Sequence, residues 1–181
     1  MCHSRDVSLE ARRAKWEGGN PDYNFFFMEK ALSLAYRYLS FRPRTVVEIE
    51  KYLQKKAVRY LFTPGEIQAS IEILKDQGYL NDLEFIKSFV SSRSSLKPKS
   101  KWVLEMELKK LGVSQEDVNI FFSENSTDEG KLAQTALKKK MRMLSLIPDK
   151  RKRLVKAISF LQRRGFSFDV AKEAYNEIFL A

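Results

Sequence analysis

The residues of this chain best suited to chemistry are cations, and the excess of positive charge is concentrated in its last third. Residues 128–181 hold 13 Lys or Arg against 6 Asp or Glu, in a chain whose net charge is +10. At 100° per helical residue, two sets of cations fall opposite apolar stripes: Lys138, Lys139 and Arg142 opposite Ala133, Leu137 and Leu144, and Lys152 and Lys156 opposite Leu154, Ile158 and Leu161. Faces of mainly one sign could bind phosphates or an acidic protein surface. The alternative is an ordinary solvated surface.

Two further groups of cations are candidates for the same contact. Arg163 and Arg164 precede a glycine at the predicted end of a helix, as do Lys109 and Lys110. These pairs could contact phosphate, or they could interact only with the negative end of the helix dipole, which is worth about 0.3–1 kcal/mol. The other group lies in and around the polar connection 91–100 and consists of Arg93, Lys97, Lys99 and Lys101. This connection is either a flexible grip for a partner or an exposed loop.

Catalytic and metal chemistry is not indicated. The sequence has no glycine-rich phosphate loop, no cluster of metal ligands and no nucleophile with a plausible base. His3 is the sole histidine, and no Ser, Cys or carboxylate constellation accompanies it. We therefore expect no enzyme, no cofactor, no metal and no small-molecule substrate. An enzyme with an unrecognised site is kept as a third alternative to the two binding functions described below.

The compartment is indicated by what the sequence lacks. Cys2 is the one cysteine and cannot form an internal disulfide, which favours a reducing environment. No signal peptide is visible, and the apolar run 25–28 is far too short to cross a bilayer. We expect a soluble, cytoplasmic protein with no membrane partner.

The cations must be positioned by helices, and a repeated sequence motif predicts where these helices end and begin. Leu161-Gln162-Arg163-Arg164-Gly165-Phe166-Ser167 reads as a helix end, a glycine stop, an apolar residue and the serine that caps the next helix. Leu108-Lys109-Lys110-Leu111-Gly112-Val113-Ser114 has the same pattern 53 residues earlier, and a degenerate copy, Leu53–Val58, lies 55 residues before that. A motif at near-constant spacing predicts tandem repeats.

The predicted fold is all-α, with three tandem three-helix repeats that form an elongated, curved array. Low Gly and Pro content and apolar residues at helical spacing support nine helices. The local signals include a cap at Thr45, a capping box at Thr63-Pro64-Gly65-Glu66, a glycine stop at Gly78, and one long helix capped by Thr127 and buried through Ala133, Leu137, Met141 and Leu144. The predicted domains are a flexible arm at 1–22 and repeats at 23–80, 81–125 and 126–181, the last being the most basic.

A run at the start of the second repeat resembles the signature of the RecX regulators of the RecA recombinase: Gly78-Tyr79-Leu80-Asn81-Asp82, then Phe85, Phe89-Val90 and Arg93. Further matching pieces are Ala31-Leu32, Leu39, Arg42-Pro43-Arg44, Glu48, Glu107-Leu108, Gly112-Val113, Phe160-Leu161 and Arg164-Gly165-Phe166-Ser167. The resemblance covers about residues 28–180. Departures are Asn81-Asp82 where the family usually has two aspartates, Lys97-Pro98-Lys99 and Ala57 where it usually has glycines, and an apparent insertion at 59–62.

The resemblance implies a protein that binds the RecA–DNA filament and lowers RecA's ATPase, strand-exchange and coprotease activities. It also implies weaker contact with single-stranded or duplex DNA, and we expect a monomer. The alternative function is a helical module that binds DNA without regard to sequence and acts without RecA. Binding of that kind weakens steeply with salt, because it depends on phosphate contacts.

Overall fold

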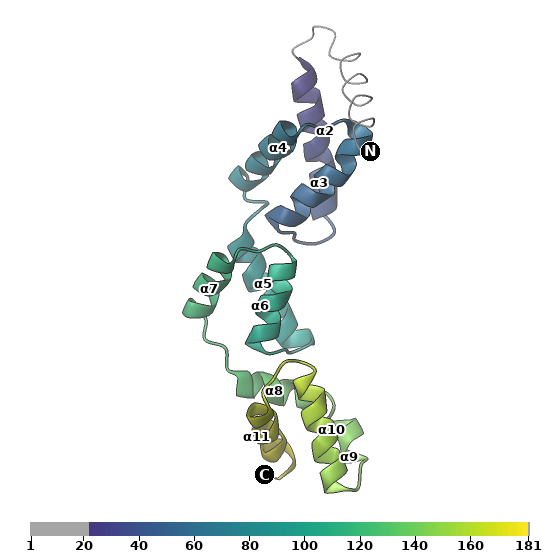
Figure 1. Cartoon of the computed structure of the whole chain (residues 1–181), viewed down its shortest axis with the longest axis vertical. Helices are drawn as coiled ribbons and strands as arrows, with labels where there is room; N and C mark the ends of the chain where they lie inside the picture. Colours follow the sequence, from purple (N-terminus) through teal and green to yellow (C-terminus); the bar gives the residue numbers. More distant parts are fainter. Residues whose placement is uncertain (1–21, 181) are drawn as a thin grey trace, which may run out of the picture. The chain divides into compact units, whose positions relative to one another are not determined.

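The computed structural model describes residues 22–180, which fold into helices joined by short connections (Figure 1). The first group contains α2 (Asp22–Leu39), α3 (Val46–Tyr60) and α4 (Pro64–Asp76); the second contains α5 (Asp82–Leu96), α6 (Lys101–Lys110) and α7 (Gln115–Glu124). The third contains α8 (Glu129–Lys138), α9 (Met141–Ser145), α10 (Lys150–Gln162) and α11 (Phe168–Phe179). No strand occurs between residues 22 and 180, so the predicted all-α fold is confirmed. The predicted arm falls almost entirely outside the described residues.

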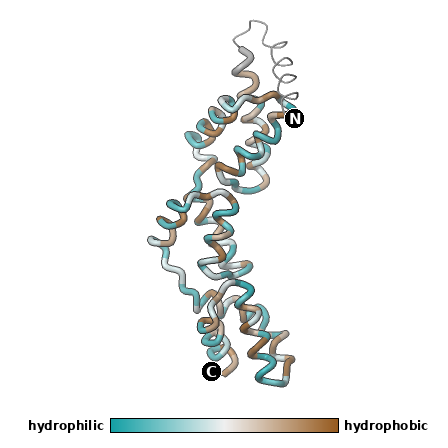
Figure 2. The backbone as a smooth tube through the Cα atoms, in the orientation of Figure 1, coloured by the Kyte–Doolittle hydropathy of each residue, from teal (hydrophilic) through white to brown (hydrophobic). Residues whose placement is uncertain are grey.

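The chain divides into two compact units between Phe85 and Ile86. In the first unit, α2, α3 and α4 pack on one another around a core that includes Ala31, Ile49 and Leu74. The second unit contains most of α5 and all later helices, and its largest core lies among α8, α10 and α11. Along the helices, apolar and polar residues recur in alternation (Figure 2), as expected for helices that bury one side.

The repeated sequence motif has the predicted local structure in both full copies, at residues 108–114 and 161–167. Gly112 and Gly165 adopt left-handed φ values of 86° and 88°. The N–H after each glycine reaches back to a helix carbonyl, from Val113 to Leu108 and from Phe166 to Leu161, both at 3.2 Å. This is the hydrogen-bond pattern of a glycine-terminated helix. The serine that follows each apolar residue caps the next helix, as predicted.

The predicted caps of the first group are confirmed. Thr45 and Glu48 form a reciprocal capping box at the start of α3, and Thr63-Pro64-Gly65-Glu66 forms another at the start of α4. Burial alone would raise the pKa of the Glu48 carboxyl, but hydrogen bonds from Arg42, from the Thr45 backbone and from Arg44 lower it below its ordinary value. Glu48 therefore joins the helix start to both arginines.

The degenerate copy at Leu53–Val58 is not a helix end. Instead α3 continues to Tyr60 and ends at Leu61, whose φ of 62° makes it a left-handed non-glycine residue. Leu61 lies 4 residues beyond Ala57, the position that corresponds to Gly112. The apparent insertion is thus one extra helical turn. Without glycine at Ala57, the helix has no reason to stop there.

The long helix predicted from Thr127 is interrupted. Asp128, not Thr127, caps α8, and a turn at Lys139-Lys140 separates α8 from the short α9. Because of this turn, Met141 leaves the predicted buried stripe and is 43% exposed, whereas Leu144 stays buried. In a continuous helix Lys138 and Lys139 would lie one turn from Arg142, and like charges at that spacing destabilise a helix. The described chain therefore has ten helices, one more than predicted.

Candidate partner-binding surface

The connection between α5 and α6 is fixed by the third helical group. The backbone N–H of Ser100 donates to the carbonyl of Arg164 at 3.0 Å, and the Arg164 guanidinium donates to the carbonyl of Pro98 at 2.9 Å. The same guanidinium lies over the ring of Phe160, with 4.6 Å to its centroid. Burial lowers the pKa of Arg164. Arg164, predicted as a partner contact, thus holds the second and third groups together.

Lys139, in the turn after α8, supports the same connection. Its ammonium donates to the carbonyls of Ser95 and Leu96, the latter at 3.0 Å. On the other side, the backbone N–H of Lys101 donates to Glu129 at 2.9 Å. The connection, for which the sequence left a flexible grip and an exposed loop as alternatives, is therefore a segment anchored at several points to α8, to the turn after it and to the end of α10.

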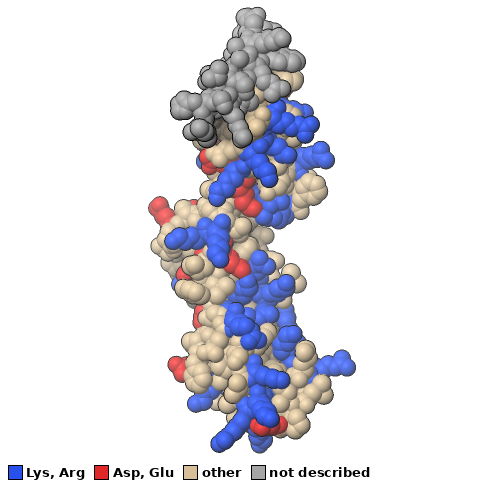
Figure 3. All heavy atoms as spheres, turned by 45° about the vertical axis from the view of Figure 1, so that its right-hand side comes forward, with Lys and Arg blue, Asp and Glu red and all other residues tan. Residues whose placement is uncertain are grey.

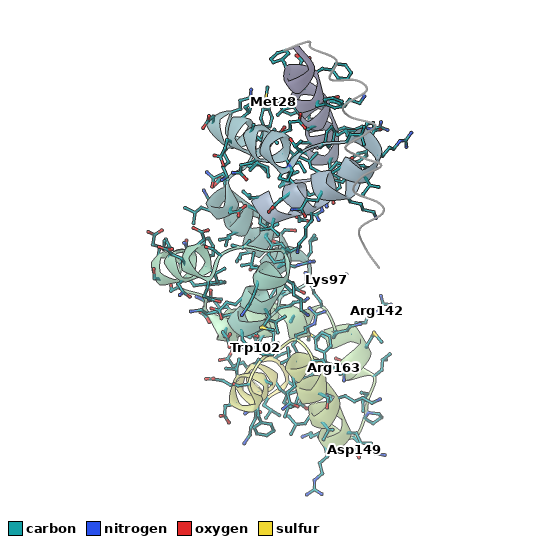
Figure 4. The ribbon with its side chains drawn as sticks, turned by 45° about the horizontal axis from the view of Figure 1, so that its top comes forward. Met28, Lys97, Trp102, Arg142, Asp149 and Arg163 are labelled. Carbon is teal, nitrogen blue, oxygen red and sulfur yellow. The ribbon has the colours of Figure 1, made fainter. Side chains whose placement is uncertain are left out.

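The cations around this connection divide by their partners. Arg93 and Lys99 both pair with Glu107, Arg93 at 3.3 Å, so one carboxylate neutralises much of their charge. Lys101 is more exposed and lies 3.9 Å from Glu105. Lys97 is exposed and is followed by buried Pro98 (Figure 4). Of the four cations predicted here, Lys97 is the one most available to a partner.

Three cations form a stripe along α10. Lys152, Lys156 and Arg163 are spaced by 4 and 7 residues, which places them on one side of the helix, and all three are exposed. On the opposite side, Ile158 and Leu161 are buried, as predicted. We call Lys152, Lys156 and Arg163 the α10 stripe. Among residues 22–180 these cations have no carboxylate partner, and neither do Lys138 or Arg142.

The first turn of α10 carries further positive charge at an unfavourable place. Lys150, Arg151 and Lys152 stand at the positive end of the helix dipole, and this turn has no acidic residue. Asp149 caps the helix through the backbone N–H groups of Arg151 and Lys152, at 2.8 and 3.1 Å. Clustered cations at a helix start oppose stability, so this arrangement favours binding of an anionic partner over an ordinary solvated surface. Figure 3 shows that Lys and Arg side chains outnumber Asp and Glu side chains on its visible face.

Two kinds of surface residue were not predicted from the sequence. Met143 and Leu146, on and after α9, are 63% and 79% exposed. The signal for them is the sequence 141–147, whose apolar residues are too close-set for one helical stripe. In the first unit, Lys51, Lys55 and Arg59 are exposed along α3. They lie in a mixed-charge part of the sequence, so net charge alone does not single them out.

No group of three or more His, Cys, Asp or Glu side chains between residues 22 and 180 could hold a metal ion. Within the same range, no helix has both the length and the apolar character needed to cross a bilayer.

Comparison with known proteins agrees with the three helical groups. Models of the first, second and third three-helix domains of RecX match residues 31–61, 81–120 and 128–175. Regulatory protein RecX of Bacillus subtilis is 34% identical over 83% of this chain, which spans 56% of that relative's length. Regulatory protein RecX of Chlorobaculum tepidum is 29% identical, with 79% of this chain and 84% of the relative covered.

A solved structure shares the fold. The crystal structure of RecX from Lactobacillus salivarius superposes with a TM-score of 0.68 at 24% identity, covering 86% of this chain and 98% of that one. The three domain matches occur in order along the sequence and fall within the three helical groups. The chain therefore belongs to the RecX family of regulatory proteins.

Proposed function

We propose that this protein binds the RecA–DNA filament and inhibits the ATPase, recombinase and coprotease activities of RecA. The observation that carries the proposal is the cationic surface of the third helical group, formed by the α10 stripe with Lys138 and Arg142, on a chain of the RecX family. These cations are exposed, and within the described part of the chain none of them has a carboxylate partner. A nucleoprotein filament offers both phosphates and acidic protein surface to such a patch.

The mechanism requires no chemistry from this chain. The exposed cations raise the rate of encounter with a negatively charged filament, and closer contacts set how long the complex lasts. A bound protein in the filament groove or at its growing end would obstruct subunit addition or the rearrangement that accompanies ATP turnover. In this scheme Arg164 and Lys139 keep the second and third groups aligned, and they reach the partner less than the α10 stripe does.

Binding to RecA-coated and to bare single-stranded DNA tests the proposal against the alternative. The measurement is fluorescence anisotropy with a labelled oligonucleotide at several salt concentrations, with and without RecA held in its filament form. We expect a clear preference for the coated strand that persists near physiological salt. Tight binding to bare DNA with a log–log salt slope near the roughly −0.9 per phosphate of a polyelectrolyte, and no gain from RecA, would instead favour a DNA-binding module.

The first turn of α10 gives a prediction in which stability and binding change in opposite directions. Replacing Lys150 and Arg151 with Glu puts negative charge at the positive end of the dipole, which should stabilise the helix by about 0.3–1 kcal/mol per site. The same change should weaken filament binding, because it reverses two exposed charges beside the α10 stripe. Urea unfolding and anisotropy measure the two effects.

A matched control makes the same double substitution at the other end of a helix, where its effect on stability should have the opposite sign. Lys109 and Lys110 lie in the last turn of α6, where cations interact favourably with the dipole. Lys109→Glu with Lys110→Glu should therefore lower stability while making the same change in net charge. If the α10 variant is less stable than the wild type, or binds the filament equally well, the interpretation of this turn is wrong.

A further inference from the structure

The short helix α9 presents apolar side chains to solvent among cations. Leu146, Met143 and Met141 are 79%, 63% and 43% exposed. At 100° per residue, Arg142 and Leu146 point directly away from buried Leu144, and Met143 lies beside them. Scattered exposed apolar residues need no explanation, but adjacent ones on one outward face indicate an interaction surface. We call Arg142, Met143 and Leu146 the α9 patch.

The α9 patch is held firmly from beneath. Leu144 belongs to the core of the third group, and Ile147 packs against that core. Backbone N–H groups of Met143 and Leu144 both donate to the carbonyl of Lys140 at 3.0 Å, and Ile147 donates to Leu144 at 3.0 Å. In Figure 1, α9 lies beside α10, in agreement with the contacts between these helices. A surface fixed in this way loses little conformational entropy when it binds.

We propose that the α9 patch is the element that contacts protein, and that it docks into an apolar recess edged by carboxylates on RecA. This inference rests on the proposed function. Met and Arg are enriched in the cores of protein–protein interfaces, whereas interfaces with nucleic acid are more polar and are dominated by phosphate contacts. Exposed Lys138 and Lys150 flank the patch in sequence, so the rim of the recess should be acidic. The α10 stripe then supplies long-range attraction, and the α9 patch supplies specificity for RecA.

Other occupants fit these observations less well. A second copy of this chain would bring two strongly basic surfaces together, which is electrostatically unfavourable. A membrane surface is normally bound by a longer amphipathic helix, whereas α9 has 5 residues. Bare nucleic acid would satisfy Arg142 but would leave Met143 and Leu146 without an apolar partner.

The test replaces Met143 and Leu146 together with Ser and measures binding to RecA-coated and to bare single-stranded DNA. We expect binding to the coated strand to weaken roughly tenfold or more, mainly through faster dissociation. Binding to bare DNA and the salt dependence should be unchanged, because no charge is altered. The matched control is Met106→Ser with Ile120→Ser, which removes two side chains that are 40% and 41% exposed on α6 and α7. This control should bind within about twofold of the wild type.

Each outcome decides the inference. If the wild type binds the filament tightly and the α9 variant binds it as tightly as the control does, the inference is wrong and the proposed function stands. If the variant loses affinity for bare DNA to the same degree, the patch contacts nucleic acid and the inference is also wrong. Self-association and binding to anionic vesicles are measured for the wild type and for the variant as well. If the wild type shows either property and the variant loses it, the patch belongs to that other occupant and the inference is wrong. If the wild type itself does not bind the filament, both the inference and the proposed function fail.

Discussion

Replacing Lys152, Lys156 and Arg163 with Glu should reduce binding to the RecA filament on the order of 100-fold at low salt, with a matching loss of ATPase inhibition. The three residues lie along the outward side of α10, and no described carboxylate pairs with them. Their reversal turns attraction to phosphates or acidic side chains into repulsion. The difference from the wild type should shrink as salt rises, because screening weakens both interactions.

The control for the α10 stripe keeps the total charge change the same. Lys109, Lys110 and Lys172 are exposed on α6 and α11, so their replacement with Glu removes the same net charge from other helices. Circular dichroism should show unchanged helical content for the stripe variant, because its three side chains contribute nothing to the core. If both triple variants lose binding equally, total charge and not the α10 stripe governs the encounter.

Gly165→Ala should destabilise the second unit by roughly 2–5 kcal/mol. Gly165 has a φ of 88°, a conformation that costs any L-residue about 1–2 kcal/mol. Its position also leaves no room for a side chain, because a Cβ there would overlap Oγ of Ser100, the N-cap of α6, and Cγ2 of Val103 on that helix. Overpacking of this kind typically adds about 1–3 kcal/mol. Since Ser100 also bonds to Arg164, the substitution should loosen the junction between the second and third groups.

Gly78 separates the backbone effect from the steric effect. It has a similar φ of 76°, but a Cβ there would meet nothing within 4 Å. Gly78→Ala should therefore cost only the backbone term, about 1–2 kcal/mol. Hydrogen exchange can measure each unit separately, which avoids assuming one cooperative transition for the whole chain. If Gly165→Ala lowers the unfolding free energy of its unit no more than Gly78→Ala does, the second and third helical groups do not meet as closely as the structure shows.

The features that the sequence predicted well are those fixed by a few neighbouring residues. Glycine at positions 112 and 165, the cap at Thr45 and the capping box at Thr63 act within one helical turn, so their residue types reveal them directly. The inward and outward sides of α10 were also predictable, because helical periodicity within one unbroken helix fixes them.

The features that could not be predicted depend on distant parts of the chain. Arg164 and Lys139 resemble solvent-exposed cations in the sequence, yet each bonds to backbone carbonyls more than 40 residues away. Glu107 on α6 pairs with Arg93 of α5 and with Lys99 of the connection, and the three side chains meet only because the chain turns between these two helices. The turn after α8 changed which residues face solvent: Met141 left the predicted buried stripe, and Met143 and Leu146 could be placed only once that turn was known.

Titration of this protein into a RecA ATPase assay driven by single-stranded DNA tests the central claim most directly. The claim is that this helical RecX-family chain restrains the filament through its exposed cationic and apolar surfaces. We predict that ATP hydrolysis by the cognate RecA falls progressively at low-micromolar protein, and that the Glu variant of the α10 stripe fails to lower it. Unchanged hydrolysis in the presence of folded wild-type protein would contradict the account.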